Sequence, residues 1–153
     1  MNPSSELPTD RLAVGQLLGR LLYHFRLELF AEREERFPDL RFPHLQIWGN
    51  VGIEGIRLTA LADRAGLGLP ACSELVDDLQ RLGYLERRPD PTDGRAKLIF
   101  PTVRGREVLD AAGNAVAELE HRWRGSLRPG EFDRACRTLD ELLRCLEEPR
   151  PSS

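Results

Sequence analysis

Residues 82–101 read LGYLERRPDPTDGRAKLIFP, and this stretch decides the fold. Residues 85–88 and 97–101 are short extended runs. The connecting segment 89–94, PDPTDG, is rich in proline, aspartate and glycine, which favour tight turns. Gly83 stands immediately before the first run, where a helix would end. The stretch therefore predicts a helix end followed by a two-stranded hairpin.

Two short helices are predicted before this hairpin, over residues 59–65 with Thr59 as cap and over residues 70–82. Ala62, Gly66 and Cys72 have the spacing of a helix-turn-helix, namely a small residue, a turn glycine and a buried apolar residue. The outward face of the second helix would enter the major groove. It carries Pro70, Ala71, Ser73, Glu74, Asp77, Asp78 and Arg81.

The acidic side chains on that outward face leave two interpretations open. Phosphates repel carboxylates, although Glu or Asp can accept a hydrogen bond from cytosine N4, and Ser73 can contact a base or a phosphate. The alternative is a solvated helix face that contacts no nucleic acid.

Apolar residues at steps of three and four predict long helices at both ends of the chain. The first is expected to start at residues 8–10 and to end before Pro38, and a short helix covers residues 44–51. Thr102 caps a later helix, and Pro129 stands in the first turn of the last one. The apolar stripes of the first and last helices exceed what a small domain can cover, so they indicate a homodimer. The expected interface residues are Leu12, Leu119, Trp123, Leu139, Leu142, Leu143 and Leu146.

The charge of the chain is unevenly distributed. The net charge is −3, but residues 81–106 hold seven basic and three acidic side chains, so this segment carries +4 and the remainder −7. A local basic patch on an acidic body is typical of a protein that binds DNA at one site. No apolar run is long enough for a membrane span and the N-terminus lacks a secretory pattern, so we expect a cytoplasmic protein without a membrane partner.

The sequence contains no motif of an enzyme or a metal site. It has no GxSxG, P-loop, dinucleotide-binding or HExxH pattern. The three cysteines, Cys72, Cys136 and Cys145, form no CxxC pair and are expected to be structural. His24 and His44 lie in different elements without ligand spacing. We therefore expect a protein that is not an enzyme and that holds no metal and no cofactor.

The hairpin resembles the wing of the MarR family of bacterial transcription regulators. Its Asp93-Gly94-Arg95 matches the D-x-R element of that family, and Phe100-Pro101-Thr102 with Gly105 matches the following helix entry. The likeness covers residues 56–109 at motif level, and the helix order matches over nearly the whole chain. The peroxide-sensing branch of the family uses a cysteine near the start of the first helix, and this chain has none there.

The resemblance implies a mainly α fold with a small β-hairpin wing. Residues 1–153 would form a single MarR-like domain, with a winged helix-turn-helix over 43–102 and a helical dimerisation region over 8–36 and 103–148. It also implies that Arg95 reaches toward the minor groove and that Asp93 orients Arg95 or a neighbour. Arg87, Arg88 and Lys97 are expected to contribute further attraction for DNA.

The resemblance further implies a function. The protein would act as a homodimer on double-stranded DNA, most commonly as a repressor, and a small aromatic ligand would release it. Candidate pocket residues are Tyr23, His24, Arg26, His44 and Trp48, with the alternative that Tyr23 and Trp48 are core residues. The recognition helix departs from the serine- or threonine-rich start and the arginine of many members. This leaves open a second function, a degenerate winged-helix module that binds a protein and not DNA.

Overall fold

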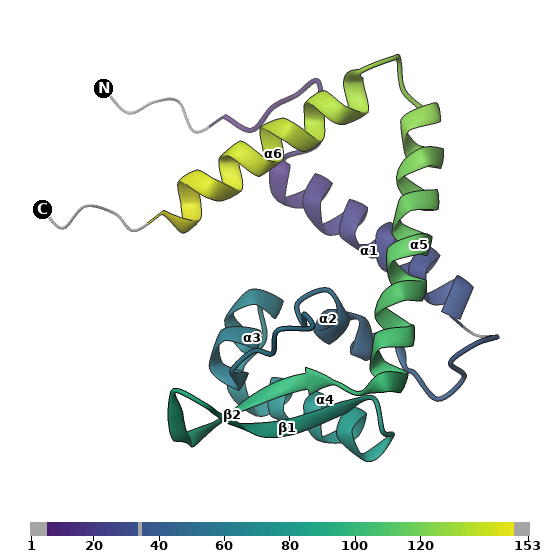
Figure 1. The fold of residues 1–153 in the computed structure, drawn as a ribbon. Coiled ribbons are helices and arrows are strands. Elements are labelled where there is room, and N and C mark those ends of the chain that lie inside the picture. The colour runs from purple at the N-terminus through teal and green to yellow at the C-terminus, as the bar shows by residue number, and fades with distance from the viewer. Residues whose placement is uncertain (1–5, 34, 149–153) are drawn as a thin grey trace, which may run out of the picture. The chain divides into compact units, whose positions relative to one another are not determined.

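The structure is a computed structural model and describes residues 6–33 and 35–148, so the predicted chain ends lie partly outside the described residues. It confirms a mainly helical fold with one antiparallel hairpin (Figure 1). The elements are α1 Val14–Arg33, the 3-10 turn η1 Phe42–His44, α2 Leu45–Trp48, α3 Leu58–Ala65, α4 Leu69–Arg81, β1 Leu85–Asp90, β2 Asp93–Pro101, α5 Val103–Gly125 and α6 Glu131–Glu147.

The chain divides into two compact units, Met1–Gly113 and Asn114–Ser153. The first contains the helix-turn-helix and the hairpin, and the second contains the end of α5 and α6. Within the described ranges, no helix combines the length and the apolarity that crossing a membrane requires.

The helix-turn-helix forms where its spacing predicts it. Gly66 ends α3 in the left-handed conformation with φ 65°, which glycine adopts without a steric penalty. Ala62 and Cys72 are buried between the two helices and the rest of the core. The predicted Thr59 cap is wrong, because the amide of Leu61 donates to the carbonyl of Arg57 and the helix therefore starts one residue earlier.

The hairpin is longer than predicted, and only Pro91 and Thr92 separate its strands. The Asp90 carboxylate accepts hydrogen bonds from the amide of Thr92 at 2.9 Å and from its hydroxyl at 2.8 Å. This local turn holds the end of β1 in the ladder. The register is irregular beside it, and residues 94–96 of β2 have no partner on β1. The regular pairs are Leu85–Pro101, Glu86–Phe100, Arg87–Ile99, Arg88–Leu98 and Pro89–Lys97.

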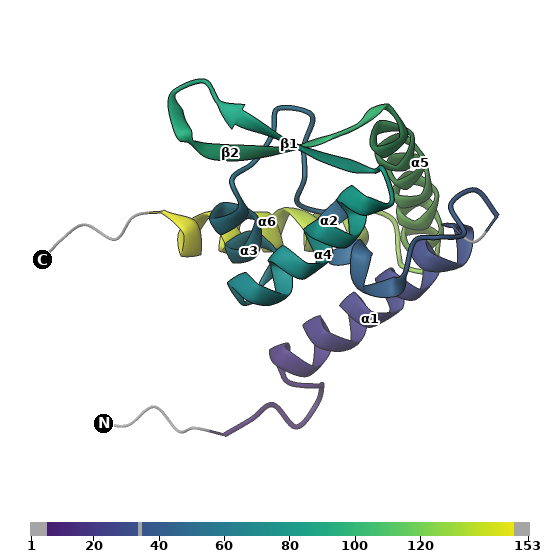
Figure 2. The same cartoon turned by 90° about the horizontal axis from the view of Figure 1, so that it is seen from below.

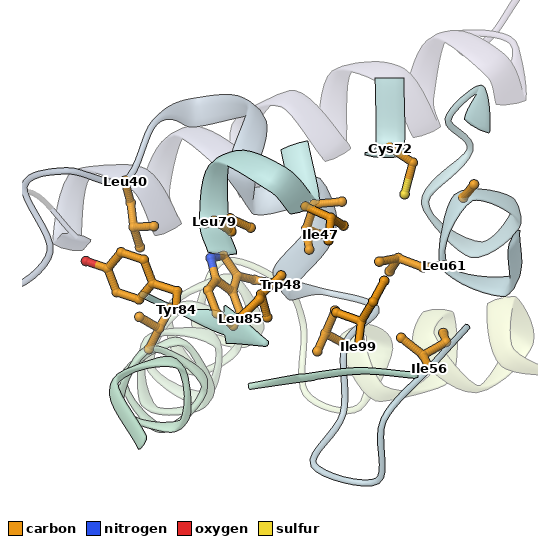
Figure 3. Close-up of a cluster of buried hydrophobic side chains, with 14 of the residues drawn as sticks. Leu40, Ile47, Trp48, Ile56, Leu61, Cys72, Leu79, Tyr84, Leu85 and Ile99 are labelled. Carbon is orange, nitrogen blue, oxygen red and sulfur yellow. The ribbon is translucent and has the colours of Figure 1, made fainter. Parts of the chain in front are cut away.

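The core of the first unit lies between the hairpin and the three short helices. Figure 3 shows Tyr84 and Leu85 at one end of this cluster and Ile56 with Ile99 at the other. Ile56 also pairs with Ile99 through two backbone hydrogen bonds of 3.1 and 2.8 Å, so the segment before α3 adds a bridge to β2. The packing therefore ties the hairpin directly to the helix-turn-helix.

The long helices differ from their predictions at their starts. The first begins at Val14 and not at residues 8–10, because the Gln16 side chain accepts the amide of Ala13 and the first helical hydrogen bond ends at that residue. Thr102 caps α5 as predicted, since its hydroxyl accepts the amide of Gly105 at 3.1 Å. Pro129 lies outside α6, whose cap is Gly130 with φ 82°.

Candidate nucleic-acid interface

The tip of the hairpin presents Arg95 to solvent. Arg95 lies in the unpaired segment 94–96, and its amide donates to the Asp93 carboxylate at 3.1 Å. Asp93 therefore shapes the backbone of the tip. Arg95 and Lys97 are exposed and make no ion pair within the described part of the chain. Figure 2 shows that this closed end lies opposite the end that leads into α5.

The hairpin is braced against α3 by an ion pair that the sequence analysis missed. Arg57 donates from Nε and Nη2 to one oxygen of Asp90, at 3.0 and 2.7 Å. The amide of Thr92 and the guanidinium of Arg57 lower the pKa of Asp90 to about 2. No sequence spacing connects residues 57 and 90, which meet only because Ile56 pairs with β2. The wing is therefore held at both its turn and its side.

Asp78 lies on the predicted face of α4 but is not the solvated side chain that the sequence suggested. Its side chain is only 12% exposed and accepts from Arg41, from Arg81 and from His44 Nε2 at 2.8 Å. His44 Nδ1 accepts the amide of Arg41 at 2.9 Å, which leaves Nε2 as the donor. The hydrogen bond from Arg41, followed by that from His44, lowers the pKa of Asp78. The packing of η1 beside α4 covers this side chain.

The remaining acidic residues of α4 are in different environments. Asp77 forms an ion pair with Arg87 at 2.7 Å, so a predicted DNA-binding arginine of the hairpin neutralises it. Glu74 is exposed and has neither an ion pair nor a side-chain hydrogen bond among the residues described. The outward face of α4 contains a hollow of about 440 Å³. This hollow is lined by Arg41, Pro70, Ser73, Glu74, Asp77, Asp78 and Arg81.

The recognition helix is therefore not a negative surface. Arg41 and Arg81 pair with Asp78, and Arg87 pairs with Asp77. The formal charges of these three arginines and of the carboxylates at positions 74, 77 and 78 therefore sum to zero, although no arginine pairs with Glu74 among the described residues. Near the helix start, Pro70 and Ala71 are exposed and Ser73 is half-buried. Arg88, another predicted DNA-binding residue, pairs with Glu86, and its Cζ lies 4.7 Å from the centroid of the Phe100 ring.

The predicted pocket residues do not share one environment. His44 is fully buried in the Asp78 network, and Trp48 is a core residue at 6% exposure. Trp48 is therefore a core residue, as the alternative interpretation of the sequence stated. Tyr23 and His24 are exposed on α1 and their rings are 6.0 Å apart, whereas Arg26 is half-buried. Within the described residues, no group of three or more metal-binding side chains occurs.

The predicted interface residues also separate into two groups. Leu119 is 2% exposed within the single chain, and Trp123 is half-buried. Leu12 is exposed, as are the four leucines of α6, which are Leu139, Leu142, Leu143 and Leu146. In α6 none of the residues is buried, although its apolar side chains recur along one stripe.

The winged helix-turn-helix is the part of the chain that is similar to a known family. Residues 39–96, which run from the loop before η1 through the tip of the hairpin, match the sequence model of the MarR family. This match is confined to the winged helix-turn-helix segment, which is similar to the MarR family. Solved structures with a similar fold include a MarR family transcription regulator and the transcriptional regulator PcaV.

Solved structures share the fold of this chain over most of its length. CouR of Rhodococcus jostii RHA1, bound to p-coumaroyl-CoA, is 24% identical with a TM-score of 0.70, and the match covers 92% of this chain and 95% of CouR. The DNA complex of MepR from S. aureus is 19% identical with a TM-score of 0.67, covering 88% and 99%. PcaV from Streptomyces coelicolor, in complex with its natural ligand, is 24% identical with a TM-score of 0.63, covering 88% and 92%. No curated protein sequence matches the chain.

Proposed function

We propose that this protein is a homodimeric transcription regulator that binds double-stranded DNA through the hairpin and α4. The observation that carries the proposal is the exposed Arg95 at the tip of a hairpin whose side is braced by Arg57 and Asp90. A guanidinium held at the end of a stiff hairpin suits the negative potential of a narrow minor groove. A braced hairpin also loses little conformational freedom when it binds.

The neutral face of α4 removes the main objection to DNA binding. An acidic recognition helix would be repelled by phosphates, but Asp77 and Asp78 are already paired with arginines. Small exposed residues at positions 70 and 71 allow the start of the helix to approach base edges closely. The structures of relatives are consistent with this use of the fold, since MepR is solved with DNA.

The dimer is proposed from the apolar surfaces of the single chain. Val14, Leu18, Leu21 and Leu22 of α1 are between 44% and 58% exposed, and Leu146 of α6 is 71% exposed. Water-exposed apolar stripes of this length usually mark interfaces. We assign dimerisation to residues 8–36 and 103–148 and DNA binding to residues 43–102.

Ligand-controlled repression is part of the same proposal. CouR is solved with p-coumaroyl-CoA and PcaV with its natural ligand, so the fold accommodates small aromatic or other organic molecules. We propose that such a ligand releases this protein from DNA and that the protein represses transcription. Thermal shift and DNA-release measurements with a panel of aromatic acids and their thioesters test this part.

DNA binding is tested by selecting bound sequences from random duplexes at low salt and measuring their affinity by fluorescence anisotropy. Arg95→Ala should weaken binding by about tenfold, because one cationic contact is lost. The slope of log affinity against log salt concentration should fall by about one, since one fewer counterion is released on binding. Arg128→Ala, an exposed arginine in the loop before α6, serves as the control and should bind normally. Equal affinities of the two variants would mean that the wing does not contact DNA. Absence of binding at low salt would favour a module that binds a protein partner.

A further inference from the structure

One carboxylate of α4 has no partner among the residues that the structure describes. Of its three acidic residues, Asp77 is paired with Arg87 and Asp78 accepts from Arg41, Arg81 and His44. Glu74 is exposed, and no ion pair or side-chain hydrogen bond engages it within the described residues. Its carboxylate is therefore available to an external hydrogen-bond donor.

The surroundings of Glu74 allow it to act beside a phosphate backbone. It lines the hollow on α4 together with Arg41 and Arg81, whose side chains are 64% and 73% exposed. These two guanidinium groups can approach phosphates while the carboxylate faces the base edges between them. Its position, four residues after Pro70 and one turn into α4, lies in the part of a recognition helix that contacts bases.

The chemistry of the major groove limits what a carboxylate can recognise there. Guanine presents two acceptors, and thymine presents an acceptor and a methyl group, so neither can donate to Glu74. Adenine has a donor at N6 next to an acceptor at N7, which repels a carboxylate. Cytosine presents its N4 amine, which donates without a neighbouring acceptor on the same base.

We propose that Glu74 is a specificity-determining residue that accepts a hydrogen bond from cytosine N4 in each half of the DNA site. This inference rests on the proposed DNA binding, which would stand without it. A C·G pair is then required at one position per half-site, and replacing that pair lowers affinity by about tenfold.

The experiment is a repeated selection from random duplexes with the wild-type chain, Glu74→Gln, Glu74→Ala and the control variant Glu107→Gln. Glutamine pairs with adenine through N6 and N7, so Glu74→Gln should change one position per half-site from cytosine to adenine. Glu74→Ala should lose selectivity at that position only. Glu107→Gln removes an exposed negative charge from α5, away from the predicted DNA-binding residues, and should keep the cytosine. Thermal melting confirms that the variants fold, which is expected because Glu74 is exposed.

The outcomes separate the two hypotheses. A wild-type site without a required cytosine, or a Glu74→Gln site identical to that of the wild type, would overturn the role of Glu74 and leave DNA binding intact. A wild-type chain that selects no DNA would overturn the proposed function and this inference together.

Discussion

Asp78 provides the most informative test of how the recognition helix is held. Replacing it by alanine leaves the Nε2 donor of the fully buried His44 without its acceptor, and an unsatisfied buried donor destabilises a fold by about 1–3 kcal/mol. The exposed partners Arg41 and Arg81 contribute at most about 1 kcal/mol each. We therefore expect Asp78→Ala to lower the free energy of unfolding by about 2–4 kcal/mol.

The assay is urea unfolding followed by circular dichroism, at one protein concentration because a dimer gains stability by mass action. Asp77→Ala is the matched control, since Asp77 is adjacent, is 64% exposed and pairs with Arg87. It should cost at most about 1 kcal/mol. Asp78→Asn should lie between the two because its amide oxygen still accepts from His44.

The same variant predicts a pH dependence. The pKa of Asp78 is lower in the folded chain than its ordinary value of 3.8, so the unfolded chain takes up this proton first as the pH falls. The difference in stability between wild type and Asp78→Ala should be complete above about pH 4 and should shrink in more acidic solution. If the free energies of unfolding of Asp78→Ala and Asp77→Ala differ by less than about 0.5 kcal/mol, Asp78 does not anchor the helix.

Three further predictions follow from the packing. Gly105→Ala should destabilise the fold by about 3 kcal/mol or more, because the added Cβ would lie 2.1 Å from the backbone carbonyl oxygen of Tyr84. Gly113→Ala lies in the same helix, and its Cβ would meet no atom within 4 Å, so it should stabilise the fold by about 0.5–1 kcal/mol. Urea unfolding compares the two, and equal effects would contradict this close approach. Carboxyl titration by NMR should give Asp90 a pKa of about 2 that rises in Arg57→Ala, and an ordinary value in the wild type would exclude the brace. Leu143→Glu on the exposed stripe of α6 should convert the dimer to a monomer in light scattering, and a monomeric wild type at micromolar concentration would refute the proposed assembly.

Local patterns were sufficient to predict most of the architecture. The helix-turn-helix follows from Ala62, Gly66 and Cys72, since a turn needs a left-handed residue and two helices in contact need small or apolar residues. The hairpin follows from the turn residues between two extended runs. These features depend on neighbours a few residues apart, which the sequence displays directly. Helix starts were less accurate because Ala13 and Gly130 are caps without the usual side chains.

The charge of the surface formed by α4 and the hairpin depended instead on contacts between distant residues. Arg41 and Asp78 are 37 positions apart, and Arg57 and Asp90 are 33 apart, so no periodicity connects them. The sequence alone indicates an acidic recognition helix and a basic hairpin as separate features. Folding brings Arg41, which precedes η1, and Arg87 of β1 onto the carboxylates of α4, because Coulomb attraction depends on distance in space and not along the chain. Only the tertiary structure therefore shows that Asp77 and Asp78 are paired with arginines, whereas no ion pair engages Glu74 among the described residues.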